Sequence, residues 1–319
     1  MSETVMRAVQ FDRAGGPEVL RVRDVPAPTP GSGQILVRVR AASVNPADIL
    51  SRRSRIGGFP RGTGMDYAGD VAAVGPGVDD LRPGDRVWGF LGTGRRPVGA
   101  AADYLIATRD QVAAAPASIA LVEAAALPTV GLTALQALRT LRLHDGDRLL
   151  VVGASGGVGS AAVQLGRAMG AAVTAVAGAR SGDLVRDLGA DRVLDYASID
   201  SHAPEQDFDA LIDCHGGSIS RYRRMLRRSG RGVTVAAKGF PFALLSRVLP
   251  GPSIGVVIVK PSRNDTQALT RYVDDGHLRP VIDTTYPLAA IQDAHRAVET
   301  GHAHGKRVID LRALPPSRG

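Results

Sequence analysis

Four glycines, at positions 153, 156, 157 and 159, lie between an apolar run, RLLVV (148–152), and a helical pattern. A turn that binds a pyrophosphate needs small residues for its bend, for the approach of the backbone to the phosphate, and for close packing of helix on strand. Ala154, Gly156 and Gly159 match this spacing, with alanine in the first place. The free amides and the dipole of the helix that follows favour an anion. The stretch predicts a dinucleotide site, with a glycine-rich structural turn as the alternative.

The end of the next apolar run indicates which dinucleotide binds. An NAD site usually places Asp or Glu there, where it bonds the ribose hydroxyls. In this chain the run AAVTAVAG (171–178) is followed by Ala179, Arg180 and Ser181, without a carboxylate. A guanidinium and a hydroxyl bind the 2′-phosphate that a carboxylate would repel. We therefore predict NADPH, the alternative being that Arg180 points into water.

The composition is that of a globular protein with room for two domains. The chain has 319 residues, of which 44% are hydrophobic and 22% charged. We expect no membrane span, because apolar runs are short, and no secretory signal, because MSETVMRAVQF lacks the basic and apolar regions of one. Cys214 is the only cysteine, which excludes internal disulfides and cysteine-rich zinc sites. A cytoplasmic location is the expectation.

The formal net charge is +8, and nearly all the positive charge is arginine. The arginines cluster at 52, 53, 55 and 61 and again from 221 to 231. A basic chain can bind nucleic acid, but aromatic residues make up only 4% and Tyr222 is the only one within the second cluster. We expect solvated surface arginines and no nucleic-acid partner.

The elements that must position these residues change in character along the chain. The first 120 residues are rich in short strands and turns, and ILVRVRAASV (35–44) alternates with period two as a half-buried strand does. The stretch 121–141 is helical in pattern, with interruptions at Pro128 and Gly131. Five apolar runs with helical patterns between most of them follow, which predicts a parallel sheet with crossover helices. The tail holds two helical patterns, from 265 and from 288, and a closing strand, KRVIDL.

Longer segments show a family resemblance over nearly the whole chain. They include RAVQFDRAGGPEVL, ASVNPADIL, GMDYAGDVAAVGPGV, AAALPTVGLTALQAL, GASGGVGSAAVQL and LGADRVLDY. The chain resembles the zinc-independent quinone oxidoreductase branch of the medium-chain dehydrogenase/reductase superfamily. The segments KPSR (260–263) and GHAHGK (301–306) are similar to those of quinone oxidoreductase-like proteins from mitochondria and the chloroplast envelope.

The resemblance implies an α/β protein with a GroES-like β-rich catalytic domain, residues 1–124 and 264–319, and a Rossmann doubly wound parallel sheet domain, residues 125–263, that binds NADP. It also implies a homodimer. The implied cofactor contacts are Ser155, Gly156, Gly157 and Val158 at the pyrophosphate, Arg180, Ser181 and Tyr196 around the 2′-phosphate, and His302 and His304 near the cofactor phosphates. The alternative for the two histidines is that they lie in a solvated loop without a role in cofactor binding.

The resemblance also bears on zinc. Zinc-dependent relatives carry a Cys near ASVNPAD, a His-Glu pair near GMDYAG and a later Cys. Here Asn45, Met65 with Asp66, and Ala126 stand at those places. One carboxylate is too few ligands for tetrahedral zinc, so we predict no metal site.

Without a metal Lewis acid, reduction of a quinone or of a conjugated C=C is expected. Hydride then goes from NADPH to the quinone or to the β-carbon of an α,β-unsaturated carbonyl, and neutral donors stabilise the charge on oxygen. Asn45, Thr129 and Lys260 are the catalytic candidates for the wall of the cleft, each of which has a packing or turn role as the alternative. The competing functions are an enoyl reductase of a secondary-metabolite pathway and a non-catalytic protein that binds NADPH and RNA.

Overall fold

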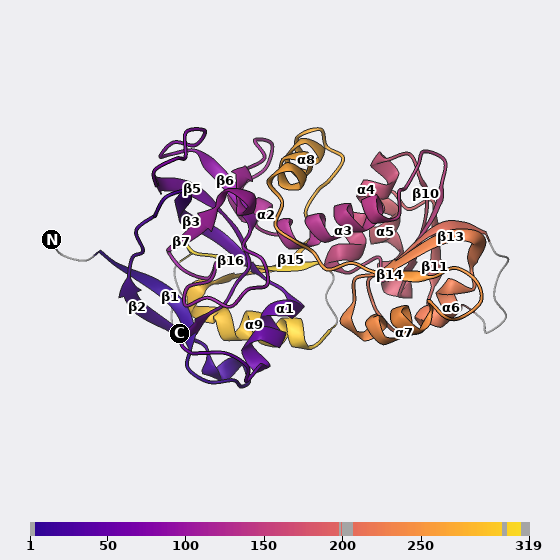
Figure 1. The fold of residues 1–319 in the computed structure, drawn as a ribbon, viewed down its shortest axis with the longest axis horizontal. Coiled ribbons are helices and arrows are strands. Elements are labelled where there is room, and N and C mark those ends of the chain that lie inside the picture. Colours follow the sequence, from indigo (N-terminus) through magenta and orange to yellow (C-terminus); the bar gives the residue numbers. More distant parts are fainter. Residues whose placement is uncertain (1–3, 198, 200–206, 302–304, 314–319) are drawn as a thin grey trace. The chain divides into compact units, whose positions relative to one another are not determined.

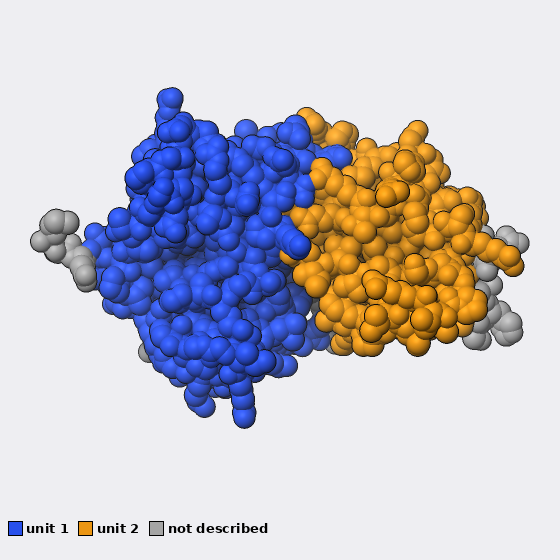
Figure 2. Space-filling model, viewed as in Figure 1, with its two compact units in different colours: residues 1–129, 260–274, 280–319 blue, residues 130–259, 275–279 orange. Residues whose placement is uncertain are grey.

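The computed structural model describes residues 4–197, 199, 207–301 and 305–313. The chain forms two compact units, which Figure 2 shows in different colours. Unit 1 comprises residues 1–129, 260–274 and 280–319, and unit 2 comprises residues 130–259 and 275–279. Unit 1 is thus built from both ends of the chain, and the glycine-rich stretch lies in unit 2.

Unit 1 contains two sheets, most of whose strands are labelled in Figure 1. The smaller has the order β2 (Arg21–Pro26), β1 (Val5–Phe11), β4 (Arg61–Gly62). The larger runs β15 (Ile282–Pro287), β16 (Lys306–Asp310), β3 (Gln34–Val44), β5 (Asp66–Val74), β6 (Arg86–Phe90), β8 (Ala113–Ala114), with β7 (Tyr104–Thr108) also paired to β3. The alternation seen in the sequence is the burial pattern of the first half of β3, whose last four residues are all buried.

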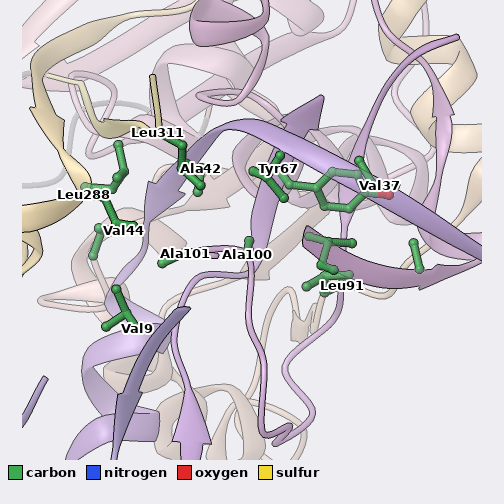
Figure 3. Close-up of a cluster of buried hydrophobic side chains, with 14 of the residues drawn as sticks. Val9, Val37, Ala42, Val44, Tyr67, Leu91, Ala100, Ala101, Leu288 and Leu311 are labelled. Carbon is green, nitrogen blue, oxygen red and sulfur yellow. The ribbon is translucent and has the colours of Figure 1, made fainter. Parts of the chain in front are cut away.

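Short helices cover these sheets, and a continuous apolar core lies between the elements. The helices are α1 (Pro46–Arg53), α2 (Leu121–Ala124), α8 (Arg263–Asp274) and α9 (Ile291–Glu299), with 3-10 turns at Pro17–Val19, Arg109–Gln111 and Leu288–Ala290. Figure 3 shows part of the core, in which Val9, Val44 and Leu311 come from strands or strand ends far apart in the sequence. Because β16 pairs with β3, the last described strand fixes the end of an early one.

Unit 2 is built on a six-stranded sheet in which every pair of neighbours is parallel. Its order is β11 (Arg192–Asp195), β10 (Ala172–Ala177), β9 (Arg148–Val152), β12 (Phe208–Asp213), β13 (Leu226–Thr234), β14 (Ile254–Val256). Counted from β9, this is the order 3-2-1-4-5-6 of doubly wound dinucleotide-binding sheets. The predicted fold class, a β-rich domain with a doubly wound parallel sheet, is confirmed.

Four described helices of unit 2 connect strands of this sheet, and one precedes its first strand in the chain. They are α3 (Pro128–Thr140), which begins in unit 1, α4 (Gly157–Ala168), α5 (Gly182–Asp187), α6 (Ile219–Arg223) and α7 (Phe240–Leu245), with 3-10 turns at Ala179–Ser181 and Ala237–Gly239. The predicted interruption at Gly131 is wrong, because α3 runs through it. Its neighbours Val130 and Leu132 are buried, and this burial outweighs the cost of about 1 kcal/mol for glycine in a helix. Pro128 begins the helix, where its missing N–H costs nothing.

Candidate active site

A buried carboxylate, Asp66 at the start of β5, organises the polar residues of unit 1. Its Oδ2 accepts hydrogen bonds from Ser43 Oγ at 2.8 Å, Asn45 Nδ2 at 2.9 Å and Lys306 Nζ at 3.4 Å. Its Oδ1 accepts from the backbone N–H of Thr129 at 2.8 Å and from the Thr129 hydroxyl. Both oxygens of this buried carboxylate are thus satisfied by hydrogen-bond donors from the protein. We call Asp66, Ser43, Asn45, Lys306 and Thr129 the Asp66 network.

Asn45 is held on both sides of its amide. It lies between β3 and α1 as the N-cap of the helix, and the residue is 2% exposed. Its Oδ1 accepts from Lys306 Nζ at 2.6 Å while its Nδ2 donates to Asp66. Its backbone N–H donates to Asp48 Oδ2 at 2.8 Å, and the other oxygen of Asp48 accepts from Gly64 N at 2.9 Å. The orientation of this predicted catalytic amide is thus fixed by ionic groups.

Lys306 and Asp48 are two titratable groups that sequence reasoning missed. Burial lowers the pKa of Lys306, and the charges of Asp66 and Asp48 oppose that shift. Burial also raises the pKa of Asp48 to about 6, although its two backbone N–H donors favour the ionised form. One signal for Lys306 was present: it is one of only three lysines in a chain whose basic residues are otherwise arginine.

The other two catalytic candidates have different surroundings. Thr129 is partly buried, and its backbone N–H is among the first of α3, which have no acceptor within the helix. Asp66 therefore acts as the cap of α3 from a neighbouring strand. Lys260 is exposed, and it is the first residue of the second segment of unit 1, just ahead of α8. The structure thus joins Asn45 and Thr129 through Asp66.

In unit 2 the glycine loop follows β9 and opens α4. Gly153 has a positive φ of 77°, which L-residues rarely adopt. A Cβ added to Gly159 would lie 2.1 Å from the carbonyl oxygen of Gly153, so only glycine fits there. The predicted pyrophosphate contacts, Ser155, Gly156, Gly157 and Val158, are partly exposed at the N-terminus of α4. Free amides at a helix N-terminus form an anion site, so this loop fits a dinucleotide pyrophosphate.

The residues predicted around the 2′-phosphate gather where β10 ends. Arg180 is exposed, whereas the Ser181 residue is 4% exposed and precedes α5. Tyr196, which is 59% exposed, lies against Gly178, since a Cβ added to that glycine would be 3.1 Å from Tyr196 Cε1. Asp195 is the carboxylate in register with the end of β10, and it accepts the N–H of Ala197 in its own turn. Arg180 and Ser181 thus follow the end of β10, and Tyr196, which follows the neighbouring strand β11, lies beside Gly178. His302 and His304 lie outside the described residues.

Several arginines of the second cluster, residues 221–231, form ion pairs or hydrogen bonds within unit 2. Arg227 pairs with Asp209 at 2.6 Å, and Arg231 pairs with Asp147 at 2.8 Å. Arg223 donates to the carbonyl oxygen of Pro252 at 2.6 Å. These arginines stabilise strand ends and loops of the fold itself.

Two further features concern metals and membranes. In the part of the chain that the structure describes, no three His, Cys, Asp or Glu side chains gather as metal ligands would. Over the same residues, no helix combines the length and apolar character that crossing a membrane requires.

Comparison with known proteins identifies the family. Residues 31–117 match the family described as the alcohol dehydrogenase GroES-like domain, and residues 188–309 match the family described as zinc-binding dehydrogenase. The chloroplast envelope quinone oxidoreductase homolog of Arabidopsis thaliana is 33% identical, with 97% of this chain and 100% of that protein covered. The chain belongs to the quinone oxidoreductase branch of the medium-chain dehydrogenase/reductase superfamily. It is an oxidoreductase of this superfamily, as the resemblance predicted.

Other relatives agree with this assignment. The mitochondrial NAD(P)H oxidoreductase RTN4IP1 of Homo sapiens is 33% identical, with 97% of this chain and 90% of that protein covered. Among solved structures, a quinone oxidoreductase from Coxiella burnetii superimposes with a TM-score of 0.89 at 31% identity, with 97% of this chain and 100% of that chain covered. The GroES-like part of the predicted fold is therefore also confirmed.

Proposed function

We propose that this medium-chain oxidoreductase uses NADPH, without zinc, to reduce a quinone or the C=C bond of an α,β-unsaturated carbonyl compound. The observation that carries the proposal is the Asp66 network. At the positions where zinc-dependent relatives carry ligands, this chain has Asn45, Met65 and Asp66. Both oxygens of Asp66 accept hydrogen bonds from the protein, and the Asn45 amide is held by Lys306 and Asp66. Such a donor set does not suit tetrahedral zinc.

The glycine loop supports a dinucleotide cofactor, and the end of β10 supports NADPH over NADH. The close approach of Gly159 to Gly153 packs α4 against its strand, which leaves the first helical amides available to a pyrophosphate. Arg180 and Ser181 follow β10 where an NAD site would have a carboxylate. A charge-assisted hydrogen bond to the 2′-phosphate is worth about 1.5–3 kcal/mol.

The reaction needs positioning and charge stabilisation from this chain. When bound, NADPH would supply the hydride for the β-carbon, and a proton from water or a side chain would complete the saturated carbonyl compound. Asn45 is the candidate donor to the substrate oxygen, and its fixed amide avoids reorganisation during the reaction. Thr129 is the candidate for positioning the nicotinamide or the substrate, and Lys260 the candidate for adding positive charge.

We also propose that the enzyme is a homodimer joined through unit 2. β14 is one of the two end strands of the parallel sheet, and among the described residues no strand pairs with its outer edge. Of the twelve large hydrophobic residues that the described chain exposes, six lie in and around α7 and β14. They are Leu244, Leu245, Val248, Leu249, Val256 and Ile258. A second copy of the chain would cover both the strand edge and this apolar surface.

Cofactor titration and isotope transfer test the proposed function. NADPH should bind more tightly than NADH, and Arg180→Ala should remove about 10- to 100-fold of that preference. Arg192→Ala, an exposed arginine at the start of β11, is the matched control and should leave it intact. Deuteride from labelled NADPH should appear at the β-carbon of an enone product. Equal affinity for both cofactors, or label at the carbonyl carbon of an alcohol, would overturn the proposal.

A further inference from the structure

A small polar hollow in unit 1 lies beside the Asp66 network. Its lining includes Asp48, which accepts the backbone N–H of Asn45, and Met65, which precedes Asp66. Three arginine residues also contribute to its lining, Arg61, Arg95 and Arg96. The hollow is therefore adjacent to the proposed catalytic amide and rich in positive charge.

None of these three arginines forms an ion pair with a carboxylate within the described ranges of the chain. Arg61 is 2% exposed, and its nitrogen atoms donate to main-chain carbonyls, among them Gly58 O at 2.8 Å. Arg96 donates to Leu91 O at 2.7 Å. These bonds satisfy the N–H groups without neutralising the charges.

Arg95 is the most accessible of the three. It is exposed and donates to Ser54 Oγ at 3.2 Å, and a guanidinium has more N–H donors than that bond uses. Its charge acts on Arg61, whose pKa is lowered first by burial and then by the repulsion from Arg95. Burial also lowers the pKa of Arg96, against the attraction of Asp48. Like charges are thus held together, and an anion in the hollow would relieve their repulsion.

The lining contains one carboxyl group, Asp48, against three guanidinium groups. Both oxygens of Asp48 are engaged by backbone N–H groups at its side of the hollow. Asp48 therefore offsets only part of the positive charge, and the lining is net cationic even when Asp48 is ionised.

We infer that this hollow is an anion subsite for the substrate: the quinone or enone that the enzyme reduces carries a carboxylate or phosphate group, which Arg95 and Arg96 bind. The inference rests on the proposed function, because it places the reacting carbonyl at Asn45. The loop that supplies both arginines, 91–97, then sets substrate specificity.

A matched pair of acceptors tests this inference. The probes are (E)-4-oxopent-2-enoate and its methyl ester, which share the enone and differ in charge. Arg95→Gln, Arg96→Gln and the double variant are compared with Arg82→Gln, which removes an exposed charge outside the hollow. For the double variant, kcat/KM with the acid should fall about 10- to 100-fold while the value with the ester changes less than about 3-fold. Because the intrinsic reactivity of the two acceptors differs, the effect of each variant is read as a ratio of acid to ester.

Direct binding separates this inference from the proposed function. Levulinate, the saturated analogue of the acid, is titrated into the NADPH-loaded enzyme and compared with methyl levulinate and with inorganic phosphate. The subsite is supported if levulinate binds to the wild type and to Arg82→Gln but not to the double variant. This holds even if neither acceptor oxidises NADPH and the proposed function fails. The subsite is overturned if both acceptors are turned over and the acid-to-ester ratio of kcat/KM is the same in the double variant as in the wild type. The proposed function would then still stand. Preferential binding of phosphate over levulinate would identify a phosphate group as the natural anion. Absence of binding by levulinate and phosphate alike would also overturn the inference.

Discussion

Lys306 carries an ammonium group into the interior, and Asp66 gives it an opposite charge there. The two side chains are 7% and 0% exposed, and their nearest charged atoms are 3.4 Å apart. A buried pair adds little stability over apolar residues, but removal of one partner leaves an uncompensated charge. The network therefore serves orientation more than stability, since it fixes Asn45 and the start of α3.

The first prediction concerns this pair. Lys306→Met should reduce the free energy of unfolding by about 3–5 kcal/mol, because Asp66 is then buried without a counter-charge. Urea unfolding followed through Trp88, the only tryptophan, measures the change in unit 1. The double variant Lys306→Met/Asp66→Asn should recover part of the loss, since no charge then remains to be compensated. A loss below about 1 kcal/mol in the single variant, or no recovery in the double variant, would contradict this account.

The second prediction concerns Asp48. Burial raises its pKa from 3.8 to about 6, so the folded state holds this proton more tightly than the unfolded chain does. The contribution of Asp48 to stability therefore falls as pH rises from about 3.8 to about 6, and stays at its lower value above that range. Carboxyl NMR should give a midpoint near 6 for Asp48. The matched control is Asp12, whose pKa is lowered by its hydrogen bond to Arg23. A midpoint for Asp48 at or below its ordinary value would refute the assignment.

At the scale of elements, the turn between β9 and α4 depends on one close approach. The Cβ of an alanine at 159 would meet Gly153 O at 2.1 Å and Ala154 Cα at 2.7 Å, and both are backbone atoms that cannot move aside. A Cβ at 156 would instead lie 3.5 Å from Gly153 O, an ordinary contact, and Gly156 has a φ of −77°. Two glycines of one motif are thus required to different degrees.

We predict that Gly159→Ala separates α4 from its strand. The expected cost is about 1–3 kcal/mol in stability, together with a loss of NADPH affinity of at least about 10-fold. Gly156→Ala is the matched control for stability, because it adds the same methyl group in the same turn without a clash. Thermal unfolding and cofactor titration of both variants are the measurements. Equal stability of the two variants would show that the close approach does not govern this turn.

The elements that could be predicted from the sequence are those with local signals. The alternation in 35–44 gave β3, and the apolar runs gave five strands of the parallel sheet. β14 was missed because it has only three residues and follows a Pro-Gly-Pro sequence that is typical of a loop. The interruption predicted at Gly131 was wrong because helix propensity does not take account of the buried residues on either side of it.

The candidate site was predictable to the extent that its residues lie within one motif. The glycine loop and Arg180 were found this way, and their functional roles stay predictions. The place of Lys306 in the Asp66 network was missed because Lys306 lies more than two hundred residues after Asp66 in the chain and reaches it only through the pairing of β16 with β3. Likewise, the arginines of loop 91–97 acquire a common hollow with Arg61 only after folding.

At the scale of the whole molecule, the two units differ in which groups they bury and which they expose. In unit 1, the polar groups of Asp66, Asn45 and Lys306 meet inside. In unit 2, the sheet ends at β14, whose outer edge pairs with no strand of the described chain, and apolar side chains lie exposed on both sides of that strand in the sequence. An exposed strand edge with apolar neighbours promotes association, so a monomer would be prone to aggregation. Pairing of β14 with the same strand of a second copy would complete both sheets.

The last prediction tests this association. Ile258→Asp combined with Leu245→Asp places two negative charges in the apolar surface of unit 2. Ile258 is 62% exposed and Leu245 is 51% exposed. The variant should fold, since neither side chain is buried, and should sediment as a monomer at concentrations where the wild type is a dimer. Val22→Asp with Val5→Asp, at exposed apolar positions of β2 and β1 in unit 1, is the control and should stay dimeric. The glycine loop follows β9, and two strands, β12 and β13, lie between β9 and β14 in the sheet. The monomeric variant should therefore still bind NADPH. A wild type that sediments as a monomer, or a double variant that remains a dimer, would show that this surface does not join two copies.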